Sequence, residues 1–126
     1  MKVFGNKKME KVSLEMARQF LGKTVRVEID RPVGSKHPQH KFVYTVNYGY
    51  INGTKAPDGE ELDAYYLGTD KPLQTAEGIV KAVIHRLDND DDKLIVMPKE
   101  TDLSDAEIEA EVAFQEKWFK HIIIRK

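Results

Sequence analysis

Short, strand-like segments with little room for helices between them fill the middle of this chain. Residues 24–30 alternate apolar and polar side chains, the pattern of a half-buried strand. Further segments rich in aromatic and β-branched residues, each bounded by turn residues, follow at 42–51, 62–67, 79–87 and 94–97. Parallel strands are usually joined by a crossover helix, which these gaps hardly accommodate. The pattern therefore favours a mainly β fold built on an antiparallel barrel.

A short amphipathic helix is expected before the first strand. Met9, Val12, Met16 and Phe20 recur at helical spacing on one face, and Gly22 is placed to end the helix.

The C-terminal part of the chain carries the clearest helix signal. Ser104 as N-cap with Glu107 three residues later makes a capping box, and Leu103 with Ile108 makes a hydrophobic staple. A stripe at helical spacing continues through Ile108, Val112, Gln115 and Phe119. This stripe predicts a helix that closes one side of the barrel. Residues 122–124 either end that helix or add a last strand.

Composition limits the possible partners and compartments. With 126 residues, the chain is expected to form one domain over 1–126. Lys and Arg number 20 against 21 Asp and Glu, so there is no net field to attract nucleic acid or an acidic membrane. The chain has no cysteine, which excludes disulfides and thiolate metal sites. Without a membrane-length apolar run or a signal-peptide pattern, a cytoplasmic protein is expected.

Two acidic clusters point to chemistry that uses cations. Carboxylates crowd residues 58–63, and a second acidic run, 88–92, follows a predicted strand. Neighbouring carboxylates repel one another unless cations lie among them, and Mg²⁺ prefers oxygen ligands and often holds substrate phosphates. If the two clusters converge, they predict a divalent-metal site. A solvated turn is the alternative for either cluster alone.

The order of three motifs resembles the soluble family I inorganic pyrophosphatases, as a compact, shortened member. The motifs are Asn47-Tyr48-Gly49-Tyr50-Ile51-Asn52, then Asp58-Gly59-Glu60-Glu61-Leu62-Asp63, then the run from Asp88 to Lys93 with its following strand. The resemblance implies an OB-like, five-stranded antiparallel barrel with flanking helices. It also implies hydrolysis of pyrophosphate to two phosphates by a metal-activated water. Mg²⁺ is the expected ion, with Mn²⁺ as a second possibility, and a homo-oligomer is expected.

The same resemblance assigns roles to individual residues. The implied metal ligands are Asp58, Asp63, Asp88, Asp91 and Glu28. The implied catalytic residues are Glu60, Tyr48 and Lys93, and Tyr44 is the second active-site tyrosine. The middle acid, which assists the attacking water, is an aspartate in the family and Glu60 here. The extra methylene moves its carboxylate by about a bond length, which matters for proton transfer.

The phosphate-binding periphery departs from the family pattern. The family has a long insert after the first strand that carries a lysine, a glutamate and an arginine, whereas this chain has only residues 31–42 there. Arg31, Lys36 and Lys41 are the candidates to replace the cations, and no counterpart to the glutamate is evident. The family's late Tyr-Lys pair is also missing, although Lys120 could serve after a shift of one residue.

Other interpretations rank lower. His37 and His40 could ligate a transition metal, but with no acidic or histidine partner nearby in sequence, a solvated or phosphate-contacting loop is favoured. His85 lies in an apolar run and is expected to be a satisfied core residue. A phosphohydrolase for another small phosphoanhydride is the enzymatic alternative, because the shortened loop leaves a more open site. A non-catalytic OB-like module that binds phosphate or nucleic acid is the contrasting class, and the acidic residues weigh against it.

Overall fold

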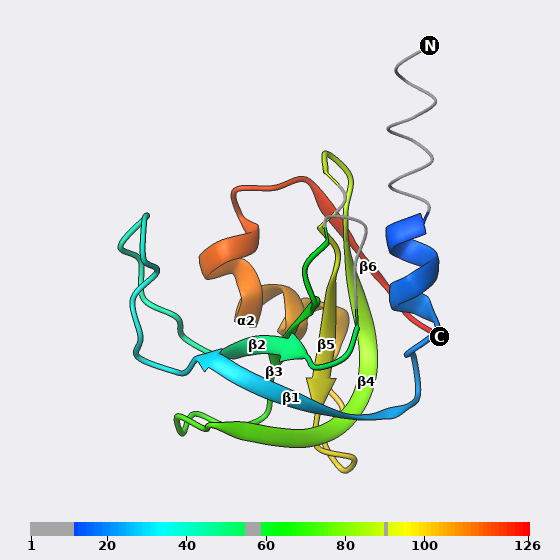
Figure 1. The fold of residues 1–126 in the computed structure, drawn as a ribbon, viewed down its shortest axis with the longest axis horizontal. Helices are drawn as coiled ribbons and strands as arrows, with labels where there is room; N and C mark the ends of the chain where they lie inside the picture. Colours follow the sequence, from blue (N-terminus) through cyan, green and yellow to red (C-terminus); the bar gives the residue numbers. More distant parts are fainter. Residues whose placement is uncertain (1–11, 55–58, 90) are drawn as a thin grey trace.

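The computed structural model describes residues 12–54, 59–89 and 91–126 (Figure 1). Its elements follow one another as β1 (Thr24–Arg31), β2 (Asn47–Ile51), β3 (Leu62–Tyr66), β4 (Thr75–Arg86), β5 (Lys93–Met97), α2 (Asp105–Glu116) and β6 (His121–Ile124). Residues 12–18 are also helical. Within these described ranges, no helix is long and apolar enough to cross a membrane.

Five of the strands close into a barrel. Neighbouring strands pair in the order β1-β2-β3-β5-β4, and β4 pairs back with β1, while β6 adds to the outer edge of β4. The predicted OB-like barrel with flanking helices is therefore confirmed. One pairing, between β3 and β5, is parallel. No crossover helix is needed for it, because the long strand β4 carries the chain from the end of β3 back to the start of β5.

Strand alternation separates two hydrophobic clusters. Side chains from all five barrel strands, with Val27, Ala64 and Val96 fully buried among them, form the first cluster. The second lies between the outer face of β3, β4 and β5 and helix α2, whose Ile108 and Val112 are fully buried. Strand β5 contributes to both clusters, which explains its unbroken apolar run.

The C-terminal elements follow the expected local signals. Ser104 accepts a hydrogen bond from the Glu107 amide and Glu107 caps Ser104 in return, so the predicted capping box is confirmed. Helix α2 ends at Glu116, which leaves Phe119 beyond the helix. Of the two outcomes left open for residues 122–124, the additional strand is the one observed.

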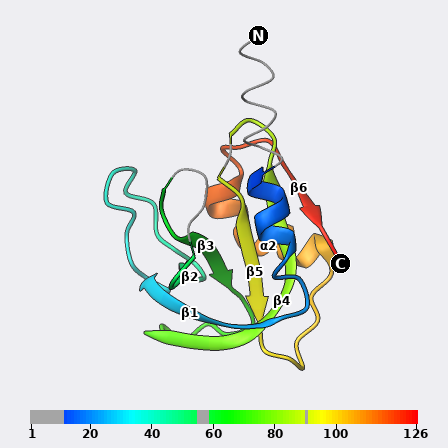
Figure 2. The same cartoon turned by 45° about the vertical axis from the view of Figure 1, so that its right-hand side comes forward.

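The N-terminal helical segment presents a different face from the one expected. Ser13 and Ala17 are buried and Leu14 packs against the first cluster, whereas Val12 is 45% exposed. Of the expected face, Phe20 also packs against that cluster, from the turn after the helical residues. Met9 lies outside the described residues. The small side chains of Ser13 and Ala17 permit close packing against the barrel, a signal that a search for large apolar residues misses. The segment and α2 lie on opposite sides of β4 and β5 (Figures 1 and 2).

Two strand boundaries also differ from expectation. Residues 42–46 were expected to begin a strand, but only a single bridge from Lys36 to Val43 forms there. Strand β4 begins at Thr75, four residues before the expected start. Gly49 marks a close approach within a continuous strand, since a Cβ there would lie 1.8 Å from the Glu28 carbonyl oxygen.

Candidate functional site

Strand register brings the two acidic clusters together. Tyr50 pairs with Asp63 across β2 and β3, and Asp63 in turn pairs with Lys93 across β3 and β5. Residues opposite each other in neighbouring strands project to the same face of the sheet. Lys93 is also the first residue of β5, directly after the second acidic run. The parallel β3–β5 pairing thus places Asp63, at the end of the first acidic cluster, beside Lys93, which directly follows the second cluster.

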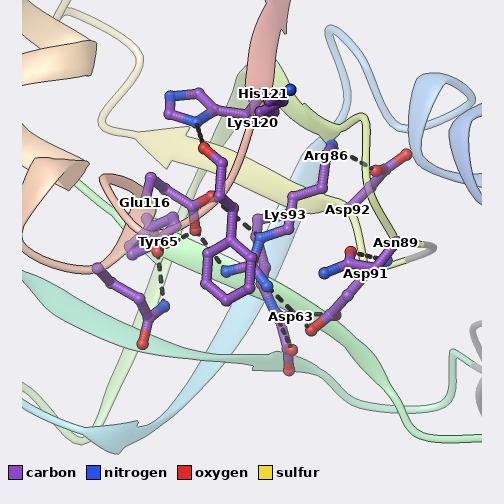
Figure 3. Close-up of polar contacts among 12 residues, drawn as sticks. Asp63, Tyr65, Arg86, Asn89, Asp91, Asp92, Lys93, Glu116, Lys120 and His121 are labelled. Carbon is purple, nitrogen blue, oxygen red and sulfur yellow. Dashed lines mark hydrogen bonds and ion pairs between the residues drawn. The ribbon is translucent and has the colours of Figure 1, made fainter.

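Lys93 holds a carboxylate from each cluster. Its Nζ lies 2.7 Å from Asp63 Oδ2 and 2.8 Å from Asp91 Oδ1 (Figure 3). The lysine side chain is only 3% exposed, while the two carboxylates are about a third exposed. Two carboxylates this close to one ammonium would repel each other in its absence. The predicted convergence of Asp63 and Asp91 is therefore observed, with a cation between them.

Two tyrosines extend this cluster. The Lys93 Nζ lies 5.6 Å from the centre of the Tyr48 ring. Burial, followed by the charges of Asp63 and Asp91, raises the pKa of Tyr48 well above its ordinary value. Tyr48 therefore stays a neutral hydrogen-bond donor well beyond physiological pH. Burial also raises the pKa of Tyr44, whose ring centre lies 5.4 Å from that of Tyr48.

These residues line a cavity of about 840 Å³. Among the described residues, its charged lining consists of three acids and three bases, namely Asp30, Asp63, Asp91, Arg31, Arg86 and Lys93. Much of its remaining described lining is aromatic and includes Phe42, Tyr44, Tyr48 and Trp118. Balanced charge beside Lys93 and Arg31 suits a small polyanion that is bound together with a cation.

Several residues assigned by resemblance lie elsewhere in the described part of the chain. Glu28 pairs with Arg26 at 3.0 Å and lines a separate pocket of about 660 Å³. Lys36 and Lys41 are exposed and do not line the larger cavity. The bulge in β1 between Ile29 and Arg31 helps to explain why Glu28 is not in the lining of the larger cavity, because the bulge changes the direction of the strand after Glu28.

The loop that follows β4 also agrees only in part with the roles that the resemblance assigns. Asp88 accepts a hydrogen bond from the Lys120 amide at 3.3 Å, and neither residue is in the described lining of the cavity. Glu60 is exposed and also lies outside that lining. Asp58 falls outside the described residues. For these four residues the roles implied by the resemblance stay predictions.

A profile of the inorganic pyrophosphatase family matches residues 7–123. The chain belongs to this family. Family membership supports the activity of an inorganic diphosphatase, a hydrolase that acts on inorganic pyrophosphate. None of the curated protein sequences matches the chain.

Solved structures agree with the family assignment. Inorganic pyrophosphatases from Ehrlichia chaffeensis and Helicobacter pylori each superpose with a TM-score of 0.62, at 16% and 18% identity. The aligned region covers 80% and 82% of this chain and 84% and 85% of theirs. An inorganic pyrophosphatase from Neisseria gonorrhoeae has 25% identity and a TM-score of 0.55, over 74% of this chain and 72% of that one. At such identities the comparison supports mainly the shared fold.

The family implies divalent metal ions, and the described residues fit them in part. Asp63 and Asp91 supply the hard oxygen ligands that Mg²⁺ prefers, at a place where Lys93 now provides the positive charge. No group of three or more potential ligands is found among the described residues. The implied third carboxylate, Asp58, lies outside them. The ligand chemistry is therefore suitable, with two carboxylates observed together.

Three features of the cavity were not anticipated. Asp30 rather than Glu28 is the β1 acid in the lining; burial raises the pKa of its carboxyl, and Asp63 adds to the effect. Arg86 lines the wall, and the buried Glu116 pairs with it at 2.7 Å. An arginine that ends an apolar strand, like a glutamate on the buried side of a helix, is a weak signal in one sequence. Their partnership depends on where α2 lies in the fold.

Buried hydrogen bonds also shape the loop that follows β4. Asp92 is buried and accepts hydrogen bonds from the Arg86 amide and from His85 Nδ1. Burial raises the pKa of Asp92, and the bond from His85 opposes that rise. His85 is thus a satisfied, largely buried residue, as expected. The paired Asp92 fixes the chain next to Asp91 and Lys93.

The histidine loop differs from a metal site. His37 Nδ1 accepts hydrogen bonds from the Gln39 and His40 amides, both at 3.1 Å, so in the neutral ring the proton is on Nε2. Burial, helped by His40 and Arg31, lowers the pKa of His37. His37 therefore presents an N–H donor in the cavity wall, which suits a phosphate oxygen better than a metal ion.

Proposed function

We propose that this chain hydrolyses inorganic pyrophosphate at the cavity that contains Asp63, Asp91 and Lys93. The observation that carries the proposal is the pair of carboxylates from two separate acidic clusters, held on either side of one buried ammonium. In a chain of this family, that arrangement matches the charge requirements of pyrophosphate and its metal ions. Water adds to one phosphorus, the bridging P–O bond breaks, and two phosphate ions leave.

The roles of the residues follow from their charges and positions. Asp63 and Asp91 would hold Mg²⁺, or Mn²⁺ in its place, and the bound ion would neutralise phosphate oxygens and lower the pKa of water. Lys93 and Arg31 stabilise negative charge on the phosphoryl groups. Tyr48 is neutral, as a phenol is at physiological pH, and donates a hydrogen bond without adding charge. Little covalent chemistry is then left to the protein.

The remaining assignments belong to the proposal as well. Glu60 is the proposed base that assists the water, and Asp58, Asp88 and Glu28 are proposed to complete the metal site through the resemblance. Tyr44 is proposed to contact substrate from the cavity wall. Lys36, Lys41 and Lys120 stay proposed substrate contacts, although the described cavity is lined by Arg31 and Arg86 instead.

The cavity lining favours a second candidate substrate class. Pyrophosphate is entirely polar, but the cavity also exposes Phe42 and Trp118, and its volume lies in the range of about 300–1,000 Å³ typical for organic ligands. A phosphoanhydride that carries an aromatic group would use both the charged and the aromatic residues of the lining. Binding of nucleic acid is not favoured, because Asp30, Asp63 and Asp91 would repel a phosphate backbone.

Location and assembly complete the proposal. We infer a single domain over 1–126 that acts in the cytoplasm as a homo-oligomer, without nucleic acid or membrane as a partner. Light scattering after gel filtration tests the oligomer, and a monomer at all concentrations would contradict it.

Phosphate release tests the function. The protein is incubated with pyrophosphate, methyl diphosphate or adenosine diphosphate, each with Mg²⁺, with Mn²⁺ and with a chelator. We expect the highest kcat/KM with pyrophosphate and no release in chelator. A higher kcat/KM with adenosine diphosphate than with both other compounds would establish the second candidate, and no release from any of the three would reject the phosphohydrolase.

A further inference from the structure

A buried arginine at the cavity wall is not explained by the resemblance. Arg86 is the last residue of β4, and its side chain is only 5% exposed although it lines the cavity. A guanidinium stays charged at any physiological pH. The cavity therefore contains a permanent positive charge beside Asp91, in the same lining as Lys93.

Two partners fix the guanidinium in place. Nε and Nη2 donate to the two oxygens of Glu116 at 3.0 and 2.7 Å, a fork that sets the plane of the group (Figure 3). Phe119 covers one face, with its ring centre 3.7 Å from Cζ. The third nitrogen, Nη1, lies 3.4 Å from Asp91 Oδ2, which is a long and weak contact. Nη1 is thus the edge of Arg86 that is directed to the acidic side of the cavity.

A line of hydrogen bonds fixes Glu116 in turn. The Tyr44 hydroxyl donates to Gln115 Oε1 at 3.1 Å, and Gln115 Nε2 donates to the Tyr65 hydroxyl at 2.6 Å. Tyr65 then donates to Glu116 Oε2 at 2.6 Å. All three hydrogen bonds run in the same direction, from Tyr44 toward Glu116. The Glu116 carboxylate is therefore held by Tyr65 on one side and by Arg86 on the other. The line joins Tyr44 on one wall of the cavity to Arg86 on another.

Stability alone is a poor explanation for this arrangement. Buried ion pairs often contribute no more than apolar residues of the same size, because both charges lose their hydration. Helix α2 already packs on the barrel through Ile108 and Val112. A bidentate fork, a stacked ring and one nitrogen left toward the cavity are what a pre-oriented anion-binding arginine requires.

We propose that Arg86 binds a phosphoryl oxygen of the substrate through Nη1 and that Glu116 and Phe119 position it. The inference deepens the proposed function, since it names the phosphate contact that takes over from the trimmed periphery. Arg86 touches the ligand, whereas Glu116 acts only through Arg86. No hydrogen bond to Glu116 has to break for this, because the long contact to Asp91 is the one exchanged.

The affinity for inorganic phosphate in the presence of Mg²⁺ tests Arg86 without any need for turnover. Arg86→Lys keeps the charge but loses the fork, and we expect it to weaken phosphate binding by about tenfold to a hundredfold, with a similar rise in KM for pyrophosphate. The rise in melting temperature with Mn²⁺ alone should be retained. Arg125→Lys is the matched control, because Arg125 pairs with Asp105 at 3.3 Å, is not in the described lining, and should leave phosphate affinity unchanged.

A double-variant cycle separates positioning from packing. Glu116→Gln preserves the shape of the side chain, and we expect weaker phosphate binding while the protein stays folded. Because Glu116 acts through Arg86, the double variant Arg86→Lys with Glu116→Gln should bind phosphate no more weakly than Arg86→Lys alone. Additive losses would overturn the positioning role of Glu116.

The results also distinguish this inference from the proposed function. Unchanged phosphate affinity and KM in Arg86→Lys, in a wild type that hydrolyses pyrophosphate, would overturn the role of Arg86 and leave the function standing. Wild type that releases no phosphate from pyrophosphate, but loses phosphate affinity on Arg86→Lys, would support the anion site and reject the hydrolysis.

Discussion

At the scale of single residues, Lys93 is the centre of the site. It is nearly inaccessible and neutralises two carboxylates that different parts of the chain supply. Lys93→Met should lower the free energy of unfolding of the metal-free protein by about 1–3 kcal/mol, because Asp63 and Asp91 lose their shared partner. Added Mn²⁺ should raise the melting temperature of this variant more than that of wild type, since the ion supplies the missing charge.

Lys81→Met is the control for this prediction. Lys81 also forms an ion pair at 2.7 Å, but its partner Asp102 is 80% exposed, so the pair contributes little. Thermal melts with and without Mn²⁺ measure both effects. A metal-induced shift in Lys93→Met that is no larger than in wild type would contradict a cation site between Asp63 and Asp91.

Glu60 tests the proposed base. Glu60→Gln should lower kcat for pyrophosphate by about two to four orders of magnitude, the usual contribution of a general base, while the metal-induced rise in melting temperature is kept. Glu60→Asp restores the residue of the family and should keep substantial activity. The exposed neighbour Glu61 provides the control variant Glu61→Gln. Near-equal kcat for wild type and Glu60→Gln would move the base role to another group.

Sequence could predict the site residues that lie in a recognised motif, such as Tyr48, Asp63 and Lys93. Their convergence depends on the parallel β3–β5 pairing, which the expected antiparallel barrel did not include. Arg86 and Glu116 could not be paired in advance, because they meet only where α2 lies against the end of β4. The bulge in β1 between Ile29 and Arg31, which no local pattern signals, follows Glu28, and Asp30 rather than Glu28 is in the described lining of the cavity.

At the scale of elements, boundaries followed local chemistry where that chemistry was strong. The capping box placed the start of α2, and the apolar run of β5 placed that strand. Sequence did not predict the early start of β4 at Thr75, where Gly78 lies within the strand and a Cβ would come 2.5 Å from the Met97 carbonyl oxygen. A glycine in a strand is ambiguous until the neighbouring backbone is known.

A histidine joins β6 to α2 and makes stability depend on pH. His121 Nε2 lies 2.7 Å from Glu109 Oε2, and Nδ1 lies 2.8 Å from the Phe119 carbonyl oxygen. Burial acts to lower the pKa of His121, but these two hydrogen bonds, with the charges of Glu109 and Glu116, raise it above its ordinary value of 6.5. The folded state therefore favours the protonated ring.

The sign of the pH effect follows from that shift. The stabilisation by His121 is complete below its ordinary pKa and is lost as the pH rises through the higher folded value. The difference in melting temperature between wild type and His121→Gln should therefore be largest near pH 6 and shrink at higher pH. Melts across the range of about pH 5.5–8.5 measure it. A difference that is constant or grows with pH would count against this coupling.

At the scale of the whole molecule, barrel closure makes the site possible. The β1–β4 pairing closes the barrel, the parallel β3–β5 pairing aligns the two acidic clusters, and α2 covers the adjacent outer face. The compact chain keeps this arrangement although the family's insert after the first strand is reduced to residues 31–42. In place of the cations that this insert carries in the family, the cavity has an aromatic wall and a buried arginine.

The central claim is that this cavity hydrolyses pyrophosphate, and the initial rate of phosphate release from pyrophosphate at saturating Mg²⁺ tests it most directly. Three proteins are compared: wild type, Asp63→Asn and the exposed control Asp70→Asn. We predict Mg²⁺-dependent release by wild type and Asp70→Asn at similar rates. Asp63→Asn should lose about a hundredfold or more, because metal and charge stabilisation contribute several kcal/mol to the barrier. Equal rates for Asp63→Asn and wild type would contradict the claim.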